Sequence, residues 1–376
     1  VDSEILKYFM VSGTSTRIKD KSLENDYRTL QGALAQAGYE PRAVERGQAI
    51  DDDVDVLYVL GNAAMDRYDA AFVDAYVMKG GKVFFAVKGV NVSPEYGLAA
   101  MAIPESGILP VLERYGFTIA PELLLDQSSL TVPFQTQGPT GGMNIQYMRY
   151  PHWVAIDGRY VSPDSQLTAR FAGLDLFWPS PLSLRPVQGV TYKELAQTTT
   201  KAWLQKKTLA AGPDDQALFA MERNDTSGQY LVAVSASGKW KSAFDPSDLP
   251  TREGAPAVPL PPAEVSPETR MVVVSSADFL TDLLRISDSG FNASFAVLAA
   301  DWLTSADDLI AIKARTALDT RLNRIRDEDT RNFLIILTYL VTLGLVPAGV
   351  IAYGMVRQSR RNRAERESRQ HRGGEA

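Results

Sequence analysis

Cysteine and histidine, two residue types that often serve in nucleophilic, acid–base and metal chemistry, are absent or rare in the chain. The sequence holds two histidines, His152 and His371, and no cysteine. The missing thiols exclude a cysteine nucleophile, disulfides, iron–sulfur clusters and cysteine-ligated zinc. A Ser–His–Asp set could use only His152, because His371 lies close to the end of the chain, and a packed or exposed structural role is the expected one for His152. We therefore predict no catalytic residue, no metal site and no cofactor.

The residues that could instead bind a ligand follow apolar runs. No turn of the chain matches the phosphate-binding patterns GxGxxG or GxxxxGK[ST]. Glycines and polar residues do stand where predicted strands end, and in an α/β sheet the carboxyl ends of the strands border the ligand site. The alternative is that the glycines only end strands and that Asp278 caps the next helix. The candidate ligand-binding residues are Gly13, Gly61, Asn62, Lys88, Ser276 and Asp278.

Strand and helix signals alternate over the first third of the chain. Runs that are apolar throughout indicate strands buried on both faces, and positions at helical spacing indicate helices between them. This order is typical of a doubly wound parallel sheet of the flavodoxin-like or amidotransferase-like kind, covered by helices on both sides. The predicted strands are 5–11, 39–44, 54–60 and 82–87, and the predicted helices are 23–34, 68–76 and 108–115.

The pattern changes in the middle of the chain and then returns. Prolines and glycines punctuate short aromatic runs after about residue 130, which predicts an irregular, β-rich insert. Strands at 229–235 and 271–275 are separated by a proline-rich loop, and a helix follows at 291–302. The predicted organisation is an α/β domain at 1–127, the insert at 128–228, a return to the α/β domain at 229–305, a juxtamembrane segment at 306–332, a transmembrane helix at 333–356 and a basic tail at 357–376.

The charges are divided unevenly along the chain. Residues 333–356 carry no charge, and as a helix this segment would be roughly 36 Å long, enough to cross a bilayer. The tail after it has seven arginines and three glutamates, which give it a net charge of +4. Because the overall charge is −6, residues 1–332 carry a net charge of −10. The positive-inside rule then predicts a protein of the inner (cytoplasmic) membrane, with a cytoplasmic C-terminus, lipid contact through the helix and the Arg-rich tail, and a large extracytoplasmic domain. That topology requires an export signal or anchor upstream of Val1. The acidic domain argues against nucleic acid as a partner.

Ordered passages along most of the chain carry a family resemblance. In this order they resemble the GldG-like family, the auxiliary component of gliding-motility-type ABC transporters. One passage departs: family members commonly have a Gly-His-Gly-Glu-like turn after the first strand, where this chain has Ser12-Gly13-Thr14-Ser15, so no role is carried over to that turn. The passages are Lys7–Gly13, Tyr27–Leu30, Gly38-Tyr39, Asp55–Gly61, Phe72–Tyr76, Met78–Val83, Leu112–Phe117, Leu123–Asp126, Arg270–Leu280, Asn292–Leu303 and Asp308–Lys313.

The resemblance implies a non-catalytic bacterial subunit that binds or gates a substrate or partner beside a separate ABC permease and ATPase. Two alternatives stay open. One is a membrane-anchored hydrolase or amidotransferase-like enzyme, which would need a nucleophile on a sharp turn after a central strand. The other is a sensor or scaffold domain, for which the short tail offers little room for signalling.

Overall fold

A computed structural model describes residues 21–304 apart from 95–96, 104–105, 138–142, 166, 169–170, 172, 214–225 and 288, and also residues 352, 353, 355 and 357. The chain divides into two compact units, Val1–Asp319 and Thr320–Ala376. Gly13, the predicted strand 5–11, the juxtamembrane segment and nearly all of the predicted transmembrane segment lie outside the described residues.

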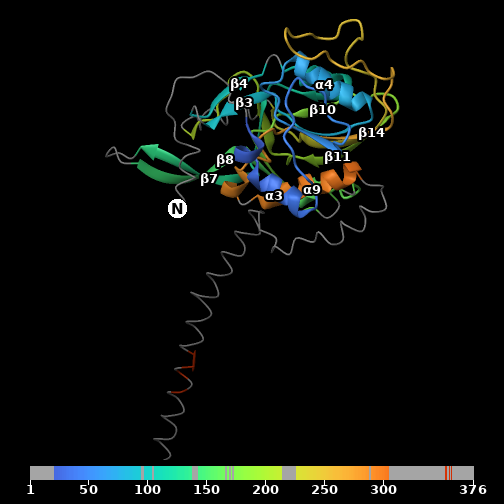
Figure 1. The fold of residues 1–376 in the computed structure, drawn as a ribbon. Coiled ribbons are helices and arrows are strands. Elements are labelled where there is room, and N and C mark those ends of the chain that lie inside the picture. Colours follow the sequence, from blue (N-terminus) through green and yellow to red (C-terminus); the bar gives the residue numbers. More distant parts are fainter. Residues whose placement is uncertain are drawn as a thin grey trace, which may run out of the picture. The chain divides into compact units, whose positions relative to one another are not determined.

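A seven-stranded mixed sheet forms the centre of the first unit (Figure 1). Its strands run in the order β1-β2-β14-β13-β10-β5, and β11 also pairs with β13. The first three strands are parallel to one another, and all the other pairings in the sheet are antiparallel. The strands are β1 (Val56–Leu60), β2 (Lys82–Ala86), β5 (Phe117–Ile119), β10 (Leu182–Leu184), β11 (Val190–Gln197), β13 (Leu231–Gly238) and β14 (Thr269–Val274).

Helices cover both faces of this sheet, as Figure 1 shows. On one face α4 (Arg67–Met78) and α5 (Ile108–Arg114) pack against Val83, Phe85 and their neighbours. On the other, α3 (Arg28–Gln36) and α9 (Gly290–Thr304) pack against the alternate side chains, including Phe84. Successive residues of a strand point to opposite faces, so an apolar run such as Val83–Ala86 supplies both cores. Two short helices, α2 (Leu23–Asp26) and α8 (Leu284–Ser287), precede α3 and α9.

Three smaller sheets stand beside the main one. β7 (Ser129–Gln137), β8 (Met143–Asp157) and β9 (Gly173–Phe177) form an antiparallel sheet, followed after β8 by the 3-10 helix η2 (Gly158–Tyr160). A third apolar cluster, which includes Trp153 and Trp178, joins this sheet to the small ones. The two remaining pairs are β3 (Val90–Ser93) with β4 (Ala99–Ala102), and β6 (Leu123–Asp126) with β12 (Ala202–Gln205).

The predicted fold class needs correction in two respects. First, the main sheet is mixed, not doubly wound parallel. β13 and β14 are joined by residues 239–268, which contain no helix, and a parallel pair needs a crossover connection that is usually helical. Residues 39–44 also form no strand.

Second, the predicted transmembrane helix at 333–356 is not supported. Within the described part of the chain, no helix combines the length and apolar character needed to cross a membrane. Tyr353 and Met355, which are among the few described residues of that segment, are 70% and 65% exposed. The lipid contact predicted for this helix and the basic tail is likewise not supported. The fold is a mixed α/β architecture with several sheets.

Candidate functional site

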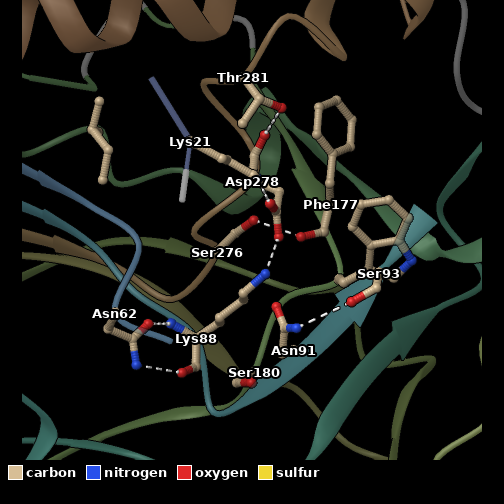
Figure 2. Close-up of polar contacts among 12 residues, drawn as sticks. Lys21, Asn62, Lys88, Asn91, Ser93, Phe177, Ser180, Ser276, Asp278 and Thr281 are labelled. Atoms are coloured by element: carbon tan, nitrogen blue, oxygen red, sulfur yellow. Dashed lines mark hydrogen bonds and ion pairs between the residues drawn. The ribbon is translucent and has the colours of Figure 1, made fainter. Parts of the chain in front are cut away.

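The three parallel strands of the main sheet end at one edge, and polar residues follow each of them. Asn62 comes after β1, Lys88 after β2, and Ser276 and Asp278 after β14. Because these strands are neighbours in the order β1-β2-β14, the residues after them must lie close together. Figure 2 shows Asn62 against the backbone of Lys88, and the Lys88 side chain directed at Asp278. We call Asn62, Lys88 and Asp278, together with Lys21, the strand-end cluster.

Asn62 holds the backbone of Lys88 in place. Its Oδ1 accepts from Lys88 N at 2.8 Å, and its Nδ2 donates to Lys88 O at 2.9 Å. The same Nδ2 also donates to Ser106 Oγ at 3.1 Å. Gly61, which follows β1, has a φ of +101°, a conformation that favours glycine. Its N–H donates to the carbonyl oxygen of Ala86, the last residue of β2. The amide of Asn62, which is 1% exposed, therefore positions the lysine from within the protein.

Asp278 is held between two ammonium groups. Lys88 Nζ lies 2.7 Å from Asp278 Oδ2, and both side chains are at least 95% buried. Lys21 Nζ pairs with the other oxygen, Oδ1, and the Lys21 side chain remains 36% exposed. Two cations on one carboxylate leave a formal charge of +1, and Lys21 is the member that solvent reaches. A buried ion pair of this kind contributes little net stability, but the loss of one partner is costly.

The pKa values in the cluster reflect this competition between burial and charge. Burial alone would raise the pKa of the Asp278 carboxyl, but the charges and hydrogen bonds of Lys21 and Lys88 outweigh it and lower the pKa from 3.8 to about 2. Burial lowers the pKa of Lys88, with repulsion from Lys21 acting in the same direction and Asp278 opposing it. Burial first, and then the charge of Asp278, raises the pKa of the nearby Tyr27 hydroxyl. The carboxylate is thus ionised at neutral pH.

The remaining predicted residues do not all join the cluster. Ser276 is fully buried and its Oγ donates to Phe177 O at 2.7 Å, so it ties the end of β14 to the end of β9. Asp278 does not act as the predicted helix cap: its carboxylate binds the two lysines, and α8 begins only at Leu284. Of the six candidates, the structure brings together Asn62, Lys88 and Asp278, with Gly61 supplying the turn. Ligand binding by any of them stays a prediction.

Three further residues at this edge were not predicted from the sequence. Lys21 reaches Asp278 from 257 positions away. Ser106 accepts from Asn62, and Ser180 Oγ accepts from Gly89 N at 2.9 Å. Lys21 and Ser106 do not stand at the end of an apolar run, and Ser180, which follows Leu176–Pro179, lies in the region whose prolines predict an irregular insert. Charge is the signal that could indicate a partner for Lys88, because a lysine at the end of a buried strand requires a carboxylate nearby.

His152, the residue on which a catalytic alternative depends, lies in β8. It is fully buried, and its ring lies 4.9 Å from that of Tyr150. Burial lowers its pKa from 6.5 to about 3. The ring is therefore neutral at pH 7 and out of contact with solvent. In the described part of the chain, no three His, Asp or Glu side chains gather in a way that could hold a metal ion.

Comparison with known proteins gives a family match, and the distant similarities include a bacterial protein and a solved structure. Residues 9–302 match the auxiliary-component family described as "ABC-type uncharacterized transport system". An uncharacterized protein of Borreliella burgdorferi is 20% identical over 359 residues, which cover 92% of this chain and 64% of that protein. The chain thus spans somewhat less than two thirds of this relative's length. The N-terminal domain of mmIFT52 superposes on 76% of this chain and 94% of its own with a TM-score of 0.42 and 12% identity.

Proposed function

The chain belongs to the family of auxiliary components of ABC-type transport systems, and we propose that it is a non-catalytic subunit that binds or gates a substrate or partner beside a separate permease and ATPase. The family indicates a role in transport and points to transporter components as partners. The finer, GldG-like assignment remains part of the proposal. Energy would come from a separate ATPase, because this chain contains no GxxxxGK[ST] sequence.

The observation that carries the proposal is the charge arrangement of the strand-end cluster. Asp278 and Lys88 are buried, while Lys21 binds the same carboxylate from a half-exposed position. An anionic group arriving at this edge would compete with Asp278 for Lys21 and leave the Lys88–Asp278 pair in place. The cluster can therefore respond to a ligand or partner without chemistry, as binding or gating requires.

The enzymatic alternative receives less support from the same region. The turn after β2, the middle one of the three parallel strands, carries Lys88 and Gly89 where a hydrolase of this class would place its nucleophile. Both groups of the buried ion pair are committed to each other, and His152 is enclosed within the protein. We therefore propose a role in binding.

The first experiment is co-purification of the full chain with the permease and ATPase encoded with it, followed by ATPase assays of the reconstituted complex. We expect the three proteins to purify together and the Lys21→Met variant to change the ATPase rate several-fold. Lys79→Met is the matched control, because Lys79 forms an exposed pair with Asp52 at 3.0 Å and precedes the start of β2, whereas Lys88 follows the end of that strand. A chain that purifies alone, or equal effects of the two variants, would overturn the proposal.

We further propose that the α/β unit works on the extracytoplasmic side of the membrane, beside the permease. The acidic balance of the chain ahead of its basic tail supports this placement. Protease added to spheroplasts should degrade the unit, while a cytoplasmic marker protein stays whole. Protection of the unit until the cells are lysed would contradict the placement.

A further inference from the structure

The long loop between β13 and β14 contains a proline-rich stretch that runs over the surface without a turn. Residues 256–261 make no turn or bend and belong to no strand or helix. The loop, in gold in Figure 1, lies on the α4 side of the main sheet. Prolines stand at positions 256, 259, 261 and 262, and residues 254–263 include no Asp, Glu, Lys or Arg. We call residues 255–263 the proline segment.

The prolines restrict the backbone of this segment to a polyproline II helix. The ring of each proline holds φ at about −65°, and the residue before a proline is restricted to extended conformations. Every position from 255 to 262 is a proline or precedes one, except Ala257. Within the described part of the chain, no hydrogen bond uses the backbone of residues 257–263, and a polyproline II helix has none of its own.

Burial along the segment repeats every third residue, which is the period of a polyproline II helix. Val258 is buried in the apolar cluster that includes α4, and Ala255 and Pro261, three residues to either side, are half-buried. These three residues form the ridge that packs on the protein. The other positions from 256 to 263 are exposed apart from the half-buried Pro259, and Leu260 is 67% exposed. The segment therefore presents two of its three ridges to solvent, 256/259/262 and 257/260/263.

Contacts at both ends hold the segment in this conformation. At its start, the Tyr68 hydroxyl of α4 donates to Pro256 O, and the Arg252 guanidinium lies 4.3 Å from the centre of the Tyr68 ring. After its end, Ser266 N donates to Trp240 O at 2.8 Å, and Trp240 N donates to Ser266 Oγ at 3.0 Å. A segment already fixed in its bound conformation loses less entropy when it binds. The proline segment is thus preorganised for recognition.

The exposed ridges determine the chemistry of a matching surface. Pro259, Pro261 and Pro262 have no N–H, so the backbone there can only accept hydrogen bonds. The proline rings and Leu260 are apolar. Polyproline II segments bind grooves lined with aromatic side chains. Trp and Tyr are suited to such a groove, because each offers a flat apolar ring for the prolines and an N–H or O–H for the carbonyl oxygens.

The charges at the two ends of the segment differ, which gives the matching surface a direction. Glu264, after the segment, pairs with Lys241 at 2.9 Å. Glu253, before the segment, is exposed and forms no ion pair with any residue that the structure describes. A complementary groove therefore carries a Lys or Arg side chain at the end that receives Glu253, and needs none at the other end.

We propose that the proline segment binds a groove lined with Trp and Tyr side chains on the extracytoplasmic part of the permease. Pro256, Pro259 and Pro262 pack against the aromatic rings, Leu260 enters the apolar floor of the groove, and Glu253 pairs with a cationic side chain at its end. This inference rests on the proposed function, because that function supplies the permease as the partner.

The experiment uses the full chain co-expressed with the permease and ATPase, and measures how much permease the chain retains on purification. Leu260→Asp places a charge on an outward ridge and should lower retention about tenfold, as expected for a side chain at the centre of an interface. Met101→Asp is the matched control, because Met101 is an apolar side chain of β4 with 59% exposure, and it should leave retention unchanged.

A second pair of variants tests the conformation of the segment. Pro259→Ala/Pro262→Ala removes two rings from one ridge and frees the backbone, and should lower retention about fivefold. Pro246→Ala is the control, because Pro246 is an exposed proline of the same loop outside the segment. Circular dichroism and urea unfolding of each variant establish that the fold is intact. A photoreactive benzophenone side chain in place of Leu260 should cross-link to a permease segment that contains Trp or Tyr.

The outcomes separate this inference from the function on which it rests. If the wild-type chain retains the permease and all variants retain it equally, the inference is wrong and the proposed function stands. If Leu260→Asp weakens retention and Pro259→Ala/Pro262→Ala does not, the contact is apolar without recognition of the polyproline II helix, and the inference is again wrong. A cross-link to a second copy of this chain, or to a permease segment without Trp or Tyr, would also overturn it. If the wild-type chain retains no permease, the proposed function itself is wrong.

Discussion

Two of the buried aspartates in the first unit, Asp278 and Asp74, are stabilised in different ways. Asp278, at the strand ends, is held by the ammonium groups of Lys88 and Lys21. Asp74, on α4, is held by neutral donors. Tyr115 OH donates to Asp74 Oδ1 at 2.5 Å, Ala243 N donates to the same oxygen at 2.8 Å, and Ser242 Oγ donates to Oδ2 at 2.7 Å.

The difference separates a structural anchor from a responsive site. The donors to Asp74 come from the end of α5 and from the long loop between β13 and β14, so the carboxylate fastens that loop to the helix. None of them carries a charge that a ligand could compete for. Lys21, in contrast, is half-exposed and charged, and it reaches Asp278 from the far end of the described sequence. Substitutions at the two centres should therefore differ in size and in pH dependence.

The largest effect is expected where a substitution leaves a buried charge without its partner. Asp278→Ala leaves the Lys88 ammonium buried without its partner, which should lower the free energy of unfolding by about 3–5 kcal/mol. The double variant Lys88→Met/Asp278→Leu removes both charges and should recover most of that loss. Urea unfolding followed by tryptophan fluorescence measures both.

Asp248→Ala is the control for this comparison. Asp248 pairs with Arg67 at 2.6 Å, but its side chain is 73% exposed, so water can replace the lost partner. We expect no measurable change in the free energy of unfolding. Equal losses in Asp278→Ala and Asp248→Ala, or a double variant no more stable than Asp278→Ala, would show that the buried pair does not act as a unit.

A smaller effect is expected at the neutral centre. Tyr115→Phe removes one donor from Asp74 and leaves Ser242 Oγ and Ala243 N, so the loss should be about 1–3 kcal/mol. Burial, followed by the charge of Asp74, raises the pKa of Tyr115 well above its ordinary value of 10, so the hydroxyl stays a donor across the neutral range.

Tyr39→Phe provides the matched control for Tyr115→Phe. Tyr39 OH also donates to a carboxylate, Asp301, at 2.6 Å, but this hydrogen bond is only part-buried. The loss should be smaller than in Tyr115→Phe, because solvent can take the place of the hydroxyl. If the two variants lose equal stability in the same urea titration, burial does not determine the strength of these tyrosine–carboxylate contacts.

The elements around the strand-end cluster could be predicted because each is a local signal. The runs at 54–60, 82–87 and 271–275 correspond to β1, β2 and β14, which differ from them by at most two residues at either end. Where a strand that is apolar on both faces is followed by a glycine or a polar residue, the change in residue type predicts the end of the strand. The residues after parallel neighbours then meet by topology alone, and Asn62, Lys88 and Asp278 do so.

The parts that could not be predicted depend on relations between distant segments. Strand direction depends on the connection: the proline-rich stretch before residue 271 predicts a loop, but its sequence alone does not show that β13 and β14 are antiparallel. Lys21 and Ser106 carry no pattern of their own, because hydrogen bonds across 257 and 44 positions leave no periodicity. The uncharged segment from 333 to 356 shows a further limit. Its composition predicted a membrane span, and the described part of the chain contains no such helix.

The smallest expected effect distinguishes the two aspartates by pH. The folded pKa of Asp278 is about 2, below its ordinary value of 3.8, so its ionised form contributes stability above about pH 4 that is lost as the pH falls to about 2. Lys21→Met removes one cause of the low pKa and should lower the free energy of unfolding by about 1 kcal/mol, because Lys21 is partly exposed to solvent. The gap between wild type and Lys21→Met should be largest at pH 5 and should close toward pH 2, whereas the gap for Tyr115→Phe should not follow this course, since no cation is lost there. Urea midpoints at pH 5, 4, 3 and 2 measure both, with Lys79→Met as the control for loss of a surface lysine. A Lys21→Met gap that stays constant over this range would mean that Lys21 stabilises the strand ends by packing and not by its charge.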